Sequence, residues 1–77
     1  MNYFIADRYT RADGRVLETK VSTVDIGPAG GFDHVIKSQY SNRVIHTETV
    51  RTGNNDFDIL SGLQAAITTA RAKFDAE

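Results

Sequence analysis

The feature that most constrains this chain is one long helical pattern near its C-terminal end. Apolar side chains recur three and four residues apart within residues 55–77, which is the spacing of one face of an α-helix. The members of this stripe are Leu60, Leu63, Ile67, Ala70 and Phe74, widened on one side by Ile59 and Ala66. Everything before residue 55 reads as strands, so the chain predicts a sheet whose face this helix covers.

Polar residues mark the ends of the predicted helix. Asn55 or Asp56 can accept the first unpaired backbone amides, while Arg71 and Lys73 lie near the negative end of the helix dipole. Gly62 inside the helix costs about 1 kcal/mol relative to alanine. We therefore expect the helix to approach the sheet closely at that turn.

Four segments rich in β-branched and aromatic residues precede the helix, at residues 2–10, 15–26, 34–40 and 43–52. The first two are joined around Gly14. A two-residue loop there pairs Ala6 with Val21, whereas a three-residue loop with Gly14 in the left-handed conformation pairs Ile5 with Val21. The three-residue loop also pairs Tyr9 with Leu17 and Arg8 with Glu18.

We favour the three-residue loop because it sorts apolar and charged side chains onto opposite faces. The apolar set is Tyr3, Ile5, Tyr9, Leu17 and Val21. Asp7 is then the one charge on the apolar face, so it must lie beyond the helix or be hydrogen-bonded. In the second hairpin, a two-residue loop at Ser41-Asn42 predicts the pairs Lys37 with His46, Ile36 with Thr47 and Ser38 with Ile45. The Gly27–Gly31 segment between the hairpins contains Pro28 and cannot continue a strand, which predicts a mobile connector.

The predicted fold is α+β, with a four-stranded antiparallel β-meander followed by one C-terminal helix packed on one sheet face (β-β-β-β-α) in a single domain over residues 1–77. A helix about 10 to 12 Å wide covers two or three strands spaced about 4.8 Å apart, so one sheet face stays uncovered. We expect that face to carry Phe4, Ala6, Val16, Val35, Val44 and Val50 among Arg8, Glu18, Lys20, Lys37, His46 and Glu48. Such a mixture is typical of protein interfaces.

Composition argues against several functions. The chain has no cysteine, which excludes disulfides and thiolate zinc sites. Nine basic residues against ten acidic ones give a formal charge of −1, which neither attracts nucleic acid nor imitates it. No secretory signal precedes the first strand, and no apolar run reaches the roughly 18 residues of a membrane span. We expect a soluble, cytoplasmic protein.

The sequence predicts no catalytic residue, metal or cofactor. In the favoured register His34 and His46 lie on opposite faces of their hairpin, whereas two ligands must converge on one metal. Ser61 lies inside a helix rather than at a nucleophile turn. The Gly27–Gly31 loop lacks the lysine and the following helix of a phosphate loop.

Binding is the function that the exposed residues favour. Arg8, Arg11 and Arg15 cluster around the tip of the first hairpin, where Tyr9 can stack on a base or a guanidinium. Tyrosine and arginine are also the residue types that most often anchor protein interfaces. The predicted binding residues are Arg8, Tyr9, Arg11, Arg15, Tyr40 and Arg43.

In its size and its lack of catalytic motifs the chain resembles small accessory proteins of bacteriophages and mobile elements, including anti-CRISPR and other anti-defence inhibitors. The near-neutral charge departs from the acidic DNA mimics among them. The resemblance implies steric occlusion of a nuclease or nucleoprotein complex and assigns no residue. Our leading hypothesis is therefore a non-enzymatic protein-binding module that acts on a protein or protein–nucleic acid complex, or on its own copy in a homodimer. The alternative is a nucleic-acid binder led by the three arginines, and a small-ligand or metal-dependent activity comes third.

Overall fold

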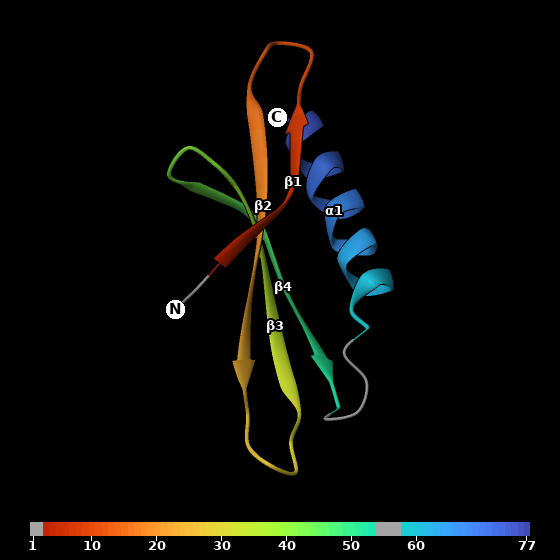
Figure 1. Cartoon of the computed structure of the whole chain (residues 1–77). Coiled ribbons are helices and arrows are strands. Elements are labelled where there is room, and N and C mark those ends of the chain that lie inside the picture. The colour runs from red at the N-terminus through yellow and green to blue at the C-terminus, as the bar shows by residue number, and fades with distance from the viewer. Residues whose placement is uncertain (1–2, 54–57) are drawn as a thin grey trace.

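The predicted helix lies across one face of a four-stranded antiparallel sheet, as the β-β-β-β-α prediction requires. The computed structural model describes residues 3–53 and 58–77. Its elements are β1 (Tyr3–Thr10), β2 (Val16–Asp25), β3 (Phe32–Tyr40), β4 (Arg43–Thr52) and α1 (Leu60–Asp75). The strands are neighbours in chain order, and Figure 1 shows α1 running along one side of the twisted sheet only.

The first hairpin has the three-residue loop predicted from its sequence. The Arg11 amide donates to the Arg15 carbonyl at 2.8 Å, and Gly14 between them has a φ of +89°. Glycine adopts this left-handed conformation at no steric cost. Tyr9 accordingly lies opposite Leu17, and Arg8 lies opposite Glu18, which confirms this part of the register.

A β-bulge at Ala6 overturns the rest of that register. Ile5 pairs with Lys20 instead of Val21, because the extra residue in β1 reverses which face each earlier side chain occupies. Tyr3 and Ile5 therefore point away from the helix, and the prediction that they line the apolar face is wrong. Ala6 instead packs against the core, and Phe4 takes the position opposite Val21.

A second bulge has the same effect on β4. The two-residue turn is confirmed, since Tyr40 pairs with Arg43 and Ser41 has a φ of +52°. Beyond Val44, however, Ile45 is an extra residue. The observed pairs are Ser38 with His46, Lys37 with Thr47 and Ile36 with Glu48, so the three predicted pairs are each wrong by one residue. His46, Glu48 and Val50 consequently lie on the helix side, not on the uncovered face.

The segment between β2 and β3 is a turn closed by its own hydrogen bonds. The Ile26 amide donates to the Gly31 carbonyl at 3.0 Å, and the Gly30 amide donates to the Gly27 carbonyl at 3.1 Å. A Cβ atom on Gly31 would lie 2.0 Å from the Thr52 carbonyl oxygen, so only glycine fits there. β2 and β3 thus form a third hairpin, and its register places Lys20 opposite Lys37.

The core lies between α1 and the sheet in two adjoining clusters. One contains the buried residues Leu17, Ala70 and Phe74, against which Tyr9, Tyr40 and Ile45 pack. The other contains Val21, Ile36 and Ala66, against which Ala6, Val50, Ile59 and Leu63 pack. Alanines at two of the three buried helix positions bring the backbone of α1 near the sheet, because they add little side-chain bulk.

The helix is shorter than its pattern and is rotated relative to the predicted stripe. It begins at Leu60, which is 57% exposed, whereas Ala66 is fully buried and central to the contact. Asn55 and Asp56, the predicted caps, lie outside the described residues. Asp58 accepts the Leu60 amide at 2.9 Å. The predicted close approach at Gly62 is confirmed, since a Cβ atom there would lie 2.7 Å from Cγ2 of Val50.

Candidate protein-binding surface

The sheet face that α1 does not cover, here called the open face, presents apolar side chains to solvent. Cross-strand partners share a face, so the pairing assigns alternate residues of each strand to it. Its apolar members are Tyr3, Ile5, Val16, Val24, Val35 and Val44, and all of these except Val35 are 38% to 50% exposed. The open face is therefore a wide surface of β-branched and aromatic side chains, and no helix or strand within residues 3–53 and 58–77 packs on it.

Charged side chains lie between these apolar ones and are mostly paired across strands. Arg8 Nε lies 3.2 Å from a Glu18 carboxylate oxygen, and Lys20 Nζ lies 3.7 Å from the other one. Arg51 donates two hydrogen bonds to Asp33, at 2.7 and 3.1 Å, which lower the pKa of that carboxyl. These exposed pairs contribute little to stability.

Lys37 is the exception on this face. It lies directly opposite Lys20 on the neighbouring strand, and its Nζ atom lies 5.1 Å from the centre of the Tyr3 ring. Among the residues that the structure describes, no carboxylate comes within 4.0 Å of this ammonium group. The charged residues described on the open face are four cations (Arg8, Lys20, Lys37 and Arg51) and two carboxylates (Glu18 and Asp33). Their net charge is +2.

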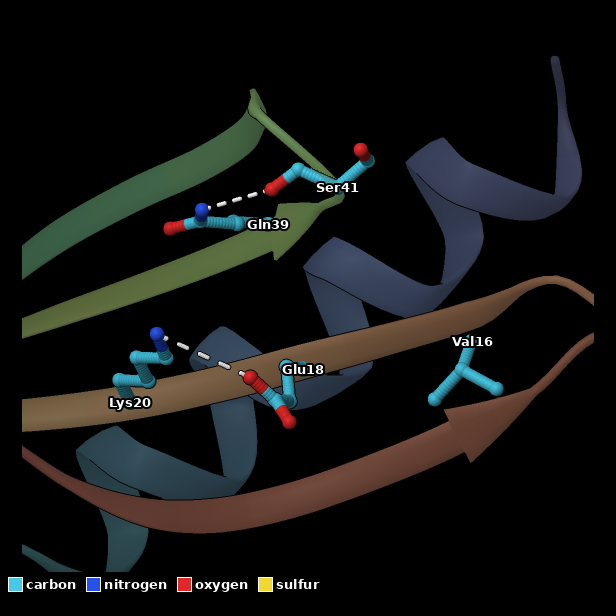
Figure 2. Close-up of a pocket in the computed structure, with 5 residues that line it drawn as sticks. All are labelled: Val16, Glu18, Lys20, Gln39 and Ser41. Atoms are coloured by element: carbon cyan, nitrogen blue, oxygen red, sulfur yellow. Dashed lines mark hydrogen bonds and ion pairs between the residues drawn. The ribbon is translucent and has the colours of Figure 1, made fainter.

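A shallow hollow of about 280 Å³ lies on the open face beside these lysines. It is lined by Val16, Glu18, Lys20, Gln39 and Ser41. Figure 2 shows these side chains on β2 and at the end of β3, with α1 behind the sheet, and marks the Lys20–Glu18 ion pair. Lys37 precedes Gln39 by two residues on β3 and shares its face. The hollow therefore adjoins the Lys20–Lys37 pair.

Of the six predicted binding residues, only Arg8 lies on the open face, where its side chain is 63% exposed. The other five gather around the C-terminal end of α1, on the helix side of the sheet or in the first loop. They are Tyr9, Arg11, Arg15, Tyr40 and Arg43. The structure thus divides the predicted set between two surfaces.

Arg11 closes the end of the helix. Its Nη1 atom donates to the Phe74 carbonyl at 2.6 Å, its guanidinium lies 4.3 Å from the centre of the Phe74 ring, and its side chain is only 11% exposed. A cation at this position also complements the helix dipole. Hydrogen bonds from Arg11 hold the pKa of Asp13 at about 2, below its ordinary value of 3.8.

Tyr9 and Arg43 also make contacts within the chain. The Tyr9 hydroxyl lies 2.8 Å from both carboxylate oxygens of Asp75, and this hydrogen bond raises the pKa of Tyr9. Arg43 pairs with Glu77, whose pKa it lowers. Arg15 keeps a side chain that is 51% exposed, although it lies 3.5 Å from Asp13. Of the predicted basic cluster, Arg11 contacts α1, whereas Arg8 and Arg15 pair with the carboxylates of Glu18 and Asp13 within the first hairpin.

Asp7 on β1 also forms an ion pair with a residue of α1. It lies on the helix side, and Arg71 donates hydrogen bonds to both of its oxygens, at 2.8 and 2.9 Å. The structure thus confirms the hydrogen-bonded one of the two alternatives for this carboxylate. The Arg71 guanidinium also lies 4.9 Å from the centre of the Tyr9 ring.

Both histidines lie on the helix side, so their predicted placement on opposite faces is wrong. The bulge at Ile45 moves His46, whose ring nitrogens contact Glu48 and Lys73 at 2.9 Å each. His34 is buried between the hydroxyls of Thr23 and Thr52. Within the described ranges, no group of three or more histidine or acidic side chains could hold a metal ion.

The opposed lysines are the feature that the sequence did not reveal. The sequence placed Lys20 and Lys37 on the uncovered face, but their pairing depends on the register across residues 26–31. That turn has no standard loop length from which a register can be read.

Comparison with protein-family models, curated proteins and solved structures finds no match to this chain. In the part of the chain that the structure describes, α1 is too short and too polar to cross a bilayer. The open face is therefore identified as a candidate binding surface from its geometry and side chains alone.

Proposed function

We propose that this protein is a non-enzymatic protein-binding module that docks through the open face. The observation that carries the proposal is a four-stranded sheet face with exposed Tyr, Ile and Val side chains that no described helix or strand covers. Antiparallel sheets with one solvated face usually carry polar side chains there. Exposed apolar side chains grouped on one face and mixed with cations are typical of interaction surfaces.

The size of the open face suits this role. Four strands about 4.8 Å apart and about 30 Å long give a flat footprint on the order of 500 to 600 Å². Side-chain relief enlarges this toward the roughly 800 Å² that each partner contributes to a standard interface. The thin molecule, 45 × 23 × 15 Å, would then act by covering a partner's surface, as a steric inhibitor does.

Nucleic-acid binding by Arg8, Arg11 and Arg15 receives less support. Each of these guanidiniums already lies within 3.5 Å of a Glu18 or Asp13 carboxylate. A firm grip on a phosphate backbone uses about 6 to 10 phosphate contacts. The described hairpin tip offers far fewer uncommitted cations.

Affinity capture from lysate of the source cells tests the proposal with matched variants. Ile5→Lys and Val44→Lys each place a long charged chain at an exposed position of the open face. Ala65→Lys makes a similar change on the exposed side of α1. We expect the wild type and Ala65→Lys to retain the same protein and both open-face variants to lose it. A partner retained equally by all four proteins would refute docking through this face.

A further inference from the structure

We infer that the open face recognises an acidic protein surface, with a partner carboxylate seated between Lys20 and Lys37. This inference rests on the proposed function and names the chemistry of the partner. Lys20 and Lys37 lie directly opposite each other on adjacent strands, and like charges at such positions destabilise a sheet. In the described structure Glu18 partly offsets Lys20, while Lys37 has no carboxylate neighbour.

A carboxylate arriving from outside removes this repulsion. It would contact two cations at once. The hollow lined by Val16 and Gln39 adjoins this position, and the Tyr3 ring lies near Lys37. Charge-assisted hydrogen bonds from ammonium to carboxylate are about twice as strong as neutral ones. Residue pairs that disfavour the fold are often found at functional sites. The opposed lysines are such a pair, whereas most other charges on this face are paired with opposite charges.

The rest of the open face favours a protein over a nucleic acid. Glu18 and Asp33 would repel a phosphate backbone, and the net charge of +2 is small beside that of a polyanion-binding surface. Val16, Val44 and Ile5 offer apolar contact that a protein surface can match. A two-fold contact centred on Lys20 and Lys37 would bring two such pairs together, which disfavours a second copy as the occupant.

Peptides selected from a random display library on the immobilised protein provide the probe. We expect the selected sequences to be enriched in Asp and Glu next to apolar residues. In NMR titrations the best peptide should shift the backbone amides around Lys20 and Lys37. Lys37→Glu should weaken its binding at least about tenfold, whereas Lys73→Glu, the same charge reversal on α1, should leave it unchanged. Because the carboxylate introduced by Lys37→Glu would face Lys20, this variant should also unfold at a higher temperature than the wild type.

The outcomes separate this inference from the proposed function. Neutral or basic peptides that bind the wild type, lose binding in Val44→Lys and tolerate Lys37→Glu would overturn the acidic partner and leave the docking face intact. Peptides that shift no open-face amides, or a selection without binders, would overturn both. A random single-stranded DNA that shifts the same amides as strongly as the peptide would also overturn a protein carboxylate as the ligand. Lys37→Gln, which removes the charge without adding one, should weaken the peptide less than Lys37→Glu does.

Discussion

Arg11 illustrates how the contacts of one residue limit what it can recognise. Its sequence neighbourhood suggests a basic patch, yet the guanidinium packs on Phe74, donates to a helix carbonyl and pairs with Asp13. A cation held in this way has few donors left for a ligand. A count of arginines along the chain therefore overstates the positive surface of the folded protein.

The Arg11–Asp13 pair predicts a dependence of stability on acid pH. The folded pKa of Asp13, about 2, lies below the ordinary value of 3.8, so the carboxylate favours folding. This contribution is fully present above pH 3.8 and is lost as the pH falls through about 2. We expect Asp13→Asn to unfold with a shallower pH dependence than the wild type between these values, measured by urea denaturation at a series of pH values. Parallel curves for the two proteins, or an Asp13 pKa of 3.8 measured by NMR, would contradict the prediction.

The buried hydrogen bonds of His34 predict that replacing this residue by an apolar one lowers the stability of the fold. Its Nδ1 and Nε2 atoms lie 2.8 Å from the Thr23 and Thr52 hydroxyls, respectively, and both hydroxyls can donate or accept. His34→Leu should lower the free energy of unfolding by about 1 to 3 kcal/mol, because it leaves the buried Thr52 hydroxyl without a partner. Adding Thr52→Val should recover part of the loss in chemical denaturation. A single variant as stable as the wild type would show that this network contributes nothing.

At the scale of elements, the sequence determined which segments become strands and helix but not which way the strand ends face. The loop around Gly14 could be predicted because glycine tolerates positive φ. That loop also predicts the strand pairs nearest to it, such as Tyr9 with Leu17. The bulge at Ala6 could not be read in the same way. Tyr3, Phe4 and Ile5 are all apolar, so shifting them by one residue leaves a similar pattern on each face.

Gly62 predicts a packing conflict between α1 and β4. Alanine there gains about 1 kcal/mol of helix propensity, but its methyl group would lie 2.7 Å from Cγ2 of Val50. Val50 is β-branched and cannot turn away easily. Overpacking of this kind costs about 1 to 3 kcal/mol, so we expect Gly62→Ala to destabilise the fold in thermal or urea unfolding.

A double variant tests the cause of that destabilisation. Val50→Ala removes the methyl groups that Gly62→Ala would strike. The two substitutions together should therefore cost less than the sum of their separate effects. Strict additivity would mean that the α1–β4 contact is not what requires glycine at this position.

At the scale of the whole molecule, the sequence predicts the architecture but not the charge distribution. A helical stripe and four segments rich in β-branched and aromatic residues predict one helix on one meander. The distribution of charge depends on pairings between residues far apart in sequence, such as Arg71 with Asp7 and Lys20 with Lys37. One of these pairings holds α1 near β1, and the other leaves positive charge on the open face.

This charge distribution predicts that the protein does not dimerise through its open face. A two-fold contact centred on Lys20 and Lys37 would bring the ammonium groups of both copies into one interface. Their repulsion is largely screened only beyond the Debye length, which is about 10 Å at 0.1 M salt. We expect sedimentation equilibrium to give the single-chain mass of 8.5 kDa under these conditions. Lys37→Glu should increase self-association, because the carboxylate that it adds to each copy can then pair with Lys20 of the other copy. A wild-type dimer that Val44→Lys dissociates and Lys37→Glu does not strengthen would contradict this account of the open face.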